Sequence, residues 1–419
     1  MSDVAVVGAS LAGLAAAARL AKAGHRVLLF EATDVLGGRW ARPGALPPVI
    51  TFPAPWRDLF RKSGRAFDAE LARTGHALVP APGAVHHFPD GSQLVLPTDR
   101  GEQWTVLGDA WGNAAATRWR DLLDELDQRW QVLRRLGLED EFTDAALTRQ
   151  RRRTLRVGRT VAQLAREFGQ PQAAALIRST AWRIGSDPSC TPEFVAVRLA
   201  LERTFGRWQL TRHGSPVAAA DLIEVLTARL ALRGVAVRTG EPVVAIEAGA
   251  VRTASDRVEV GATVAAVNPW EYLRLTGGTE RRLRRRTALT RPAIAPVISV
   301  RPIDDPPEPL SEHVHHAAAG VQVEYRLRGD QGGNLIEHDF TAGWTHPTPG
   351  FGTRWTSPRT WLRQPPLRAA TPGVYTASAS SRGGNDPWAQ LLSGALASYV
   401  LHEELTGADI RPTNRAYRP

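Results

Sequence analysis

The run DVAVVGASLAGLAAAARLAKAGHRVLLFE, from Asp3 to Glu31, decides the fold of this chain. Residues 4–7 form a short apolar, β-branched run, and residues 11–22 form an Ala- and Leu-rich segment of helical character. A second apolar run, residues 26–30, leads directly into Glu31. This order predicts a βαβ unit with a carboxylate at the tip of its second strand, a pattern typical of dinucleotide-binding domains.

The turn after the first strand carries the residue types that a bound diphosphate requires. Gly8 allows a sharp turn, and Gly13 lets the helix pack closely against the sheet. Ser10 stands where the G-x-G-x-x-G pattern has its middle glycine; it is small, and its hydroxyl could donate to a phosphate. We expect the diphosphate at the helix N-terminus, beside Leu11 and Ala12, where free N–H groups and the helix dipole favour negative charge.

Glu31 has the position of a carboxylate that accepts hydrogen bonds from an adenosine ribose. A 2′-phosphate would be repelled there, so a dinucleotide with a free 2′-hydroxyl is expected. Glycines alone could serve an ordinary strand-to-helix turn, but strand, helix and terminal acid together favour a dinucleotide site.

A second glycine pair follows the acid and indicates which dinucleotide binds. Gly37, Gly38 and Arg39 complete the pattern E-x-x-x-x-x-G-G-R, which resembles the extended FAD signature of the amine oxidase and phytoene desaturase superfamily. In that superfamily the segment runs beside the flavin diphosphate and ribityl chain. The resemblance therefore implies that the cofactor is FAD.

Two further segments narrow the resemblance to the phytoene desaturase group. The first is Pro-x-x-x-Arg-Asp-Leu-Phe-x-x-x-Gly at residues 53–64, and the second is Phe-Pro-Asp-Gly at residues 88–91. The second segment also predicts a turn between two short strands within residues 85–96. In that group these segments lead into a helical substrate domain that encloses an apolar tunnel.

The composition of the chain indicates a folded protein with more than one domain. Its 419 residues, 43% hydrophobic and 22% charged, suffice for two sizeable cores. Cys190 is the single cysteine, which excludes an internal disulfide and a cysteine metal cluster. No apolar run approaches the length of a membrane-spanning helix, and we expect a cytoplasmic protein, with a membrane-peripheral location as the alternative.

The formal charge of +10 could suggest nucleic-acid binding, but the arginines are spread along the chain without a nucleic-acid module, and we expect no such partner. Two basic runs, residues 150–156 and 281–286, are most simply solvated faces. Their alternative function is contact with anionic lipid headgroups or an acidic carrier domain. Oligomeric state is left open.

The middle of the chain predicts a large apolar surface. Residues 119–136 form an amphipathic helix with Trp119 and Trp130 on one face, which suits either a plain core or a ligand wall. Strand-like runs at residues 297–300, 321–327 and 334–340 suit a sheet that floors a substrate cavity. His313 and His315 share a strand face, but no acidic partner stands at ligand spacing, so no metal is expected.

The later segments resemble the family's return to the FAD domain. Residues 222–233 predict a helix, and residues 241–247 predict a strand whose backbone, by resemblance, contacts the adenine at Val243 or Val244. As side chains, both valines are ordinary strand residues.

The C-terminal segment, residues 372–401, reads as strand, glycine-rich loop and helix. It resembles the desaturase ending that holds the flavin ring, with Ser378, Gly383, Gly384 and Trp388 as the matching cofactor residues. Two departures are that Ser378 replaces a glycine, and that Asn385-Asp386 stands where another glycine is usual.

We therefore expect an α/β protein, with a Rossmann-type, GR2-like FAD-binding domain and an inserted α+β substrate domain. The FAD domain is expected at residues 1–48, 208–276 and 358–419, and the substrate domain at 49–207 and 277–357. The resemblance implies FAD-dependent dehydrogenation of a C–C or C–N bond, and the apolar lining favours a large apolar molecule such as a polyene. No catalytic side chain is evident. The alternatives are an isomerase on the same scaffold and a non-catalytic partner protein.

Overall fold

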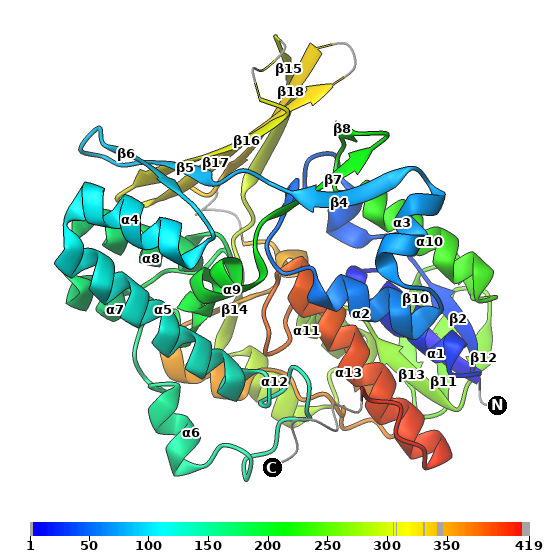
Figure 1. Ribbon diagram of the computed structural model, residues 1–419. Coiled ribbons are helices and arrows are strands. Elements are labelled where there is room, and N and C mark those ends of the chain that lie inside the picture. The colour runs from blue at the N-terminus through cyan, green and yellow to red at the C-terminus, as the bar shows by residue number, and fades with distance from the viewer. Residues whose placement is uncertain (1–2, 305, 307, 330–331, 342–346, 413–419) are drawn as a thin grey trace.

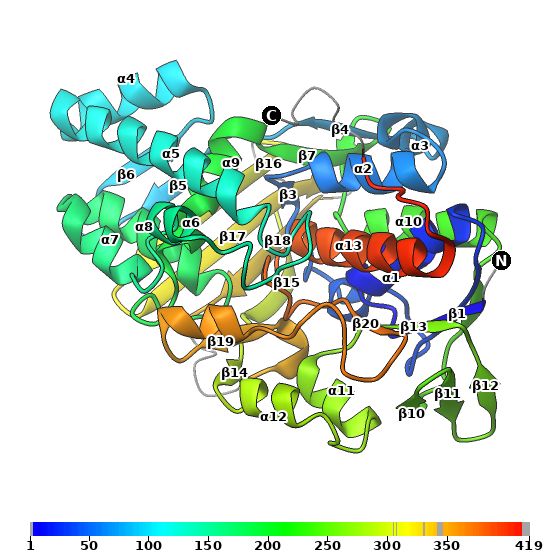
Figure 2. The same ribbon diagram turned by 90° about the horizontal axis from the view of Figure 1, so that it is seen from below.

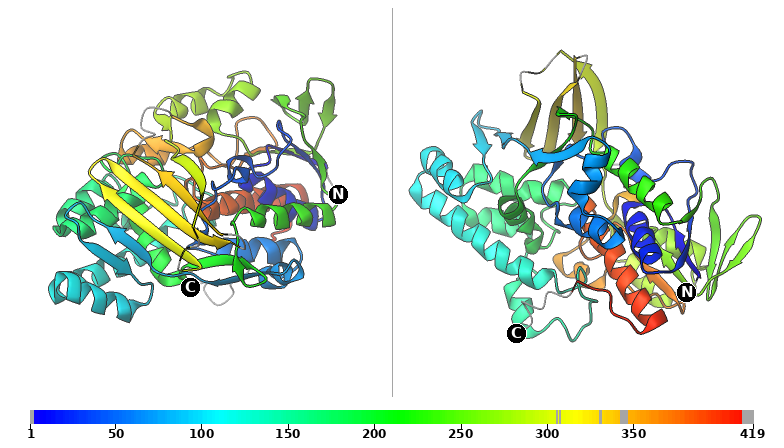
Figure 3. Two further views of the ribbon diagram at one scale, coloured as in Figure 1. Left: turned by 90° about the horizontal axis from the view of Figure 1, so that it is seen from above. Right: turned by 45° about the vertical axis from the view of Figure 1, so that its right-hand side comes forward.

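The computed structural model describes residues 3–304, 306, 308–329, 332–341 and 347–412 (Figure 1). Within these ranges, every helix is too short or too polar to cross a lipid bilayer. Two larger sheets organise the chain, and a block of helices lies beside the second of them (Figures 1 and 3).

A five-stranded parallel sheet contains the predicted βαβ unit. Its spatial order is β20-β13-β1-β2-β9, and each neighbouring pair is parallel. The strands in that order are Val374–Thr376, Ala262–Ala265, Asp3–Val7, Arg26–Phe30 and Ala236–Arg238. Three segments that are distant in sequence therefore build one sheet, and the predicted α/β class is confirmed.

The two faces of this sheet are covered by different layers. Alternate residues of β1 point to opposite sides: Val4 and Val6 pack toward helix α1 (Leu11–Lys22), whereas Ala5 and Val7 face a second cluster. That cluster includes the small antiparallel sheet β10-β11-β12 (Val243–Glu247, Ala250–Thr253, Arg257–Glu259) and helix α11 (Pro269–Leu275). The predicted strand at 241–247 thus belongs to a covering sheet and not to the parallel one.

Helices α1 and α13 (Pro387–Thr406) lie side by side (Figure 2). They approach so closely that a Cβ on Gly394 of α13 would lie 2.2 Å from the carbonyl oxygen of Ala12. Helices α2 (Ala54–Ser63) and α10 (Asp221–Leu232) also pack on α1. This packing brings the N-terminal end of α13 to the turn that precedes α1.

The second large sheet has six strands in the order β15-β18-β17-β16-β5-β6. All its pairs are antiparallel except β16 with β5. The strands in that order are Val297–Ile303, Gly332–Asp339, Gly320–Gly329, Leu310–Ala317, Ala84–His87 and Gln93–Leu96. The turn predicted within residues 85–96 is therefore a hairpin whose first strand joins this larger sheet.

A helical block packs against the six-stranded sheet through α8, which contacts β16 and β17 (Figure 1). Its helices are α4 (Arg100–Trp111), α5 (Asn113–Leu133), α7 (Val161–Phe168), α8 (Pro171–Trp182) and α9 (Val197–Phe205). Thr160 and Gln163 form a capping box at the start of α7. Trp119 and Trp130 of α5 are buried in the core of the block.

Shorter elements complete the described chain. The basic runs form α6 (Arg149–Thr154) and α12 (Arg281–Thr287). The small sheets contain β3 (Val49–Ile50), β4 (His76–Pro80), β7 (Trp208–Arg212), β8 (Ser215–Pro216), β14 (Thr290–Pro292) and β19 (Thr353–Trp355). The remaining helices are α3 (Phe67–Arg73) and the short turns η1 (Gly38–Ala41), η2 (Glu193–Ala196), η3 (Pro349–Phe351) and η4 (Pro358–Arg363).

Candidate functional site

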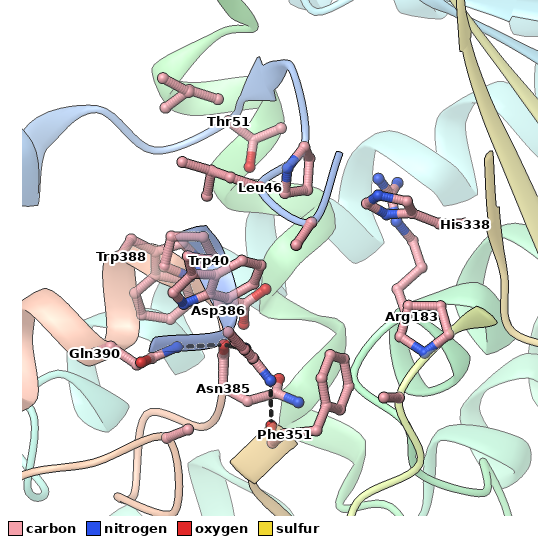
Figure 4. A pocket seen from close by; sticks show the side chains of 18 of the residues that line it. Trp40, Leu46, Thr51, Arg183, His338, Phe351, Asn385, Asp386, Trp388 and Gln390 are labelled. Atoms are coloured by element: carbon pink, nitrogen blue, oxygen red, sulfur yellow. Dashed lines mark hydrogen bonds between the residues drawn. The ribbon is translucent and has the colours of Figure 1, made fainter. Parts of the chain in front are cut away.

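One cavity of about 900 Å³ connects the parallel sheet with the helical block and the six-stranded sheet. Its wall includes the turn after β1, the end of β2, the loop around Arg39 and the segment before α13, and on the other side residues of α5, α8, β17 and β18. Figure 4 shows this arrangement, with Trp40 and Trp388 on one side and Arg183 and His338 on the other. The chain thus joins its predicted cofactor segments and its helical block in a single space.

The turn after β1 has the shape of a diphosphate cradle. Gly8 adopts a φ of +97°, a conformation that other residues rarely adopt. A Cβ on Gly13 would lie 2.1 Å from the carbonyl oxygen of Gly8, so only glycine allows α1 to start this close to the strand. Gly8 and Ser10 line the cavity, whereas Leu11, Ala12 and Gly13 are buried beneath it. These features fit a dinucleotide.

The side chain of Ser10 makes two hydrogen bonds within the protein. Its hydroxyl donates to the carbonyl oxygen of Ala266 at 3.0 Å, and its oxygen accepts from the backbone N–H of Gly13 at 3.5 Å as the N-cap of α1. A hydroxyl has one proton to donate. In this conformation the carbonyl oxygen of Ala266 takes that proton, and a contact of the Ser10 hydroxyl with a phosphate stays a prediction.

Glu31 lines the cavity at the end of β2. Its Oε2 accepts from Ala9 N at 2.8 Å, and its Oε1 accepts from Thr33 N at 3.0 Å and Thr33 Oγ1 at 2.9 Å. A carboxylate offers about four acceptor positions, so Oε2 keeps one position for a ligand hydroxyl. The geometry fits a ribose contact.

Strand β10 begins beside this acid, because the backbone N–H of Glu241 donates to the carbonyl oxygen of Glu31 at 3.0 Å. Val243 is buried and Val244 is 39% exposed. Among the described residues that line the cavity, neither valine is found. Contact of their backbone with an adenine stays a prediction.

The glycine pair of the extended signature lies directly against the diphosphate turn. Gly37 N donates to the carbonyl oxygen of Ala9 at 2.8 Å, and Gly37 forms an isolated parallel bridge with Ser10. Gly37, Gly38 and Arg39 all line the cavity. The structure therefore brings together two segments that the sequence analysis connected only through a family resemblance.

Arg39 joins this loop to the C-terminal segment. Its guanidinium lies 3.9 Å from the ring centre of Trp40 and 4.1 Å from that of Phe351. It donates to the carbonyl oxygens of Phe351 at 2.6 Å and Asn385 at 2.5 Å. Burial lowers the pKa of Arg39 to about 9, with Asp386 acting in the opposite direction. Phe351 and Asn385 were not identified from the sequence as partners of Arg39, because contacts between separate loops leave no local sequence pattern.

The segment before α13 contributes only some of its predicted residues to the cavity. Ser378 and Trp388 line it, whereas Gly383 and Gly384 are absent from the described lining. Asn385 does line it (Figure 4), and its side-chain amide donates to the carbonyl oxygen of Ile184 at 3.0 Å. Asp386 forms an ion pair with Arg198. The Asn385-Asp386 departure thus ties the loop to α8 and α9.

A buried polar cluster lies on the far wall and was not predicted. Arg183, which follows α8, donates through Nη2 to Glu312 Oε1 at 3.1 Å and to Tyr325 Oη at 3.2 Å. Glu312 also pairs with Arg207, and His338 lies beside Arg183 in Figure 4. An arginine at the C-cap of the mainly apolar helix α8 was the sequence signal for this cluster.

No group of three or more His, Cys, Asp or Glu side chains in the described ranges is arranged to hold a metal ion. His313 and His315 do lie on one face of β16, as predicted.

Comparison with known proteins connects this geometry to oxidoreductases. Residues 6–69 match the family model of the NAD(P)-binding Rossmann-like domain. The chain is 32% identical over 245 residues to the hydroxyneurosporene desaturase of Rhodobacter capsulatus. This alignment covers 54% of this chain and 48% of that protein. It is 36% identical over 151 residues to the phytoene dehydrogenase of Streptomyces griseus, covering 34% and 29% respectively. The match thus spans about half, or less, of each relative.

Solved structures share the fold at low sequence identity. An oxidoreductase from Methanosarcina mazei superposes with a TM-score of 0.65 at 13% identity, covering 94% of this chain and 99% of that one. The cyclohexylamine oxidase of Brevibacterium oxydans gives 0.62 at 16% identity, covering 96% and 99%. The expected fold is confirmed, and the sequence relatives confirm the expected resemblance to phytoene desaturases, while the amine oxidase shares the fold.

Proposed function

We propose that this chain is an FAD-dependent oxidoreductase that dehydrogenates a C–C bond of a large, mainly apolar molecule of the isoprenoid type. One observation carries the proposal: a single cavity is lined both by the dinucleotide turn and by apolar side chains of the helical block. A cofactor in the first part would face a substrate in the second. We also propose the domain division expected from the sequence, in which three segments form the FAD-binding domain and two segments form the substrate domain.

The residues of the chain would bind FAD at five places. Glu31 accepts from the adenosine ribose, and the N-terminus of α1 after Gly8 and Ser10 receives the diphosphate. Gly37 to Arg39 pass beside the diphosphate and ribityl chain. Ser378 and Trp388, in the segment leading into α13, hold the flavin end, and the backbone of Val243 or Val244 contacts the adenine.

When bound, FAD supplies a ring system that accepts hydride from the substrate. The protein then has to bind the substrate, orient its C–H bond and exclude water. Trp119, Leu123 and Leu176 line the cavity and offer apolar contact area, worth about 25 cal/mol per Å² buried. No side chain is assigned to proton transfer.

The two sequence relatives favour dehydrogenation of a C–C bond over that of a C–N bond. By their names, one is a desaturase and the other a dehydrogenase of carotenoid-type molecules. The amine oxidases share only the fold. Isomerisation with a flavin that undergoes no net redox change is the second candidate, since the same binding surfaces would serve it.

The test begins with the visible absorption spectrum of the purified protein, with and without added FAD. We expect flavin bands in the protein fraction and a rise in melting temperature with FAD. NADP⁺ should give no such rise, because Glu31 would repel its 2′-phosphate. Protein that neither contains FAD nor is stabilised by it would refute the proposal and favour a non-catalytic partner protein.

A second experiment separates the reactions. The flavin-loaded protein is mixed anaerobically with an acyclic polyene and, in parallel, with simple amines. Bleaching of the flavin bands by the polyene supports dehydrogenation. Bleaching by amines alone would indicate an amine oxidase, and a rearranged polyene without bleaching would indicate an isomerase.

A further inference from the structure

We propose that the far wall of the cavity recognises a neutral hydroxyl group on an otherwise apolar substrate, through Arg183 and His338. This inference rests on the proposed function, because it names the class of molecule that the same cavity would take. Several hydrogen-bonding atoms of this wall have no partner in the described chain and are available to a ligand.

Arg183 retains donors that the protein does not use. All its hydrogen bonds within the described chain leave from Nη2, toward Glu312 and Tyr325. Its Nε and Nη1 carry N–H groups without such partners. The side chain keeps 31% exposure although it lies in the interior, and it lines the cavity. That exposed surface therefore faces the cavity, and N–H groups of a partly buried guanidinium that lack a protein partner favour a ligand that brings an acceptor.

His338 contributes the opposite kind of group. Its Nε2 lies 2.6 Å from the carbonyl oxygen of Gly44, which can only accept, so Nε2 carries the proton. Burial is the main cause that lowers the pKa of His338 to about 4, and the charge of Arg183 acts in the same direction. The ring is therefore neutral at pH 7, and Nδ1 is an acceptor that no hydrogen bond of the described chain uses.

Tyr325 lies beside both groups, because its Oη accepts from Arg183 at 3.2 Å and its ring centre lies 5.5 Å from that of His338. A donor and an acceptor therefore belong to one wall of the cavity, where Figure 4 shows both side chains. A hydroxyl group is complementary to this pair, because its oxygen accepts from Arg183 while its proton goes to His338 Nδ1. A hydrocarbon end would leave both groups without a partner. The wall therefore distinguishes an oxygenated chain end from a purely apolar one.

The charges of the wall oppose an ionic ligand. Arg183 and Arg207 are balanced by Glu312 and Glu202, since Arg207 donates to Glu202 at 2.6 Å and pairs with Glu312. A carboxylate ligand would meet no uncompensated positive charge and has no proton for His338 Nδ1, whereas an ammonium group has no acceptor for the N–H groups of Arg183. Burial disfavours the charged guanidinium, but Tyr325, Glu312 and Glu202 together raise the pKa of Arg183 above its ordinary value.

The test compares four polyenes of equal chain length that end in a methyl, a hydroxyl, a carboxylate or an amine. Dissociation constants are measured from the quenching of tryptophan fluorescence by each ligand. We expect the wild-type protein to bind the hydroxyl form about tenfold more tightly than the hydrocarbon, as hydrogen bonds to a charged donor predict. Equal binding of these two, or tighter binding of the carboxylate or the amine, would overturn the inference.

Variants locate the effect. Arg183→Met and His338→Phe should each reduce the tenfold preference to about twofold or less, without weakening hydrocarbon binding. Arg178→Met is the matched control, because Arg178 belongs to α8 but lies outside the described cavity lining. Circular dichroism verifies that each variant folds. If Arg183→Met does not fold, His338→Phe alone tests the loss of the hydroxyl preference. A preference that survives in a folded variant of either residue would contradict the assignment.

The FAD content of the same samples separates the two proposals. Protein that prefers the hydroxyl form but does not bind FAD would refute the proposed oxidoreductase function and support hydroxyl recognition by Arg183 and His338. Protein that binds FAD but lacks that preference would refute only the hydroxyl recognition.

Discussion

Gly13 lies at a place where a side chain has no room, since its Cβ would meet the carbonyl oxygen of Gly8 at 2.1 Å and the Cβ of Ala266 at 2.9 Å. We expect Gly13→Ala to lower the free energy of unfolding by about 3 kcal/mol, because α1 must move away from the sheet. The same shift should remove FAD binding. Urea denaturation and flavin absorbance measure the two effects.

Gly24→Ala is the control for that substitution. Gly24 has a φ of +94°, but a Cβ there would meet no atom within 4 Å. Only backbone strain of about 1 kcal/mol is expected, with FAD binding retained. Equal losses in both variants would show that the close contact at Gly13 is not the cause.

Ser10 departs from the glycine motif but preserves the geometry of the turn before α1. A glycine would leave the first turn of α1 without a side-chain cap, whereas Ser10 caps it and also bonds the carbonyl oxygen of Ala266. The serine thus holds the diphosphate turn against β13 and the residues that follow it.

Glu312 acts at the scale of elements. It projects from β16 and pairs with Arg183 after α8 and with Arg207, which lies between α9 and β7. Its side chain is 1% exposed. One carboxylate therefore connects the six-stranded sheet to two parts of the helical block.

Glu312→Gln should lower the free energy of unfolding by about 3 kcal/mol, because two buried guanidinium groups would lose their shared counter-charge. Glu259→Gln is the matched control: Glu259 is 82% exposed and pairs with Arg257 at the surface, so a change below about 0.5 kcal/mol is expected. Urea denaturation of both variants gives the comparison. Similar small changes in both would mean that the buried cluster contributes little to stability.

At the scale of the whole molecule, three buried histidines of the six-stranded sheet connect stability to pH. Burial is the main cause that lowers the pKa of His86 well below its usual range, that of His316 to about 3 and that of His338 to about 4. The unfolded chain binds protons at these sites near pH 6.5, whereas the folded chain does not. Their contribution to stability is therefore complete above pH 6.5 and is lost as the pH falls toward 3 to 4.

Between pH 7 and 5 we expect the free energy of unfolding to fall by up to about 2 kcal/mol for each of these histidines. Urea denaturation at pH 7, 6 and 5 measures the slope. His338→Phe should make the slope shallower by the share of one histidine. A wild-type stability that stays constant over this range, or rises toward pH 5, would show that the rings are already protonated in the folded protein.

The sequence by itself determined the elements whose signals are local. The β1, α1 and β2 unit follows from an apolar run, a glycine-bearing turn and an Ala-rich helix, and the structure confirms it with bounds shifted by at most one residue. The capping box at Thr160 and the hairpin of β5 and β6 are equally local. Glu31, Gly37, Gly38 and Arg39 were also identified in advance, because fixed spacings along the chain carry their pattern.

Only the tertiary structure decided which distant residues meet. Arg39 stacks on Phe351, which is 312 residues away, and Glu312 is shared by Arg183 and Arg207, which are 129 and 105 residues away. Local propensity contains no information about such pairs, since they form when α8, β16 and the segment before α13 pack around one cavity. The same packing decided that Ser10 donates to Ala266 and that a mainly apolar cavity has one polar wall, because burial and hydrogen-bond partners are properties of the folded chain.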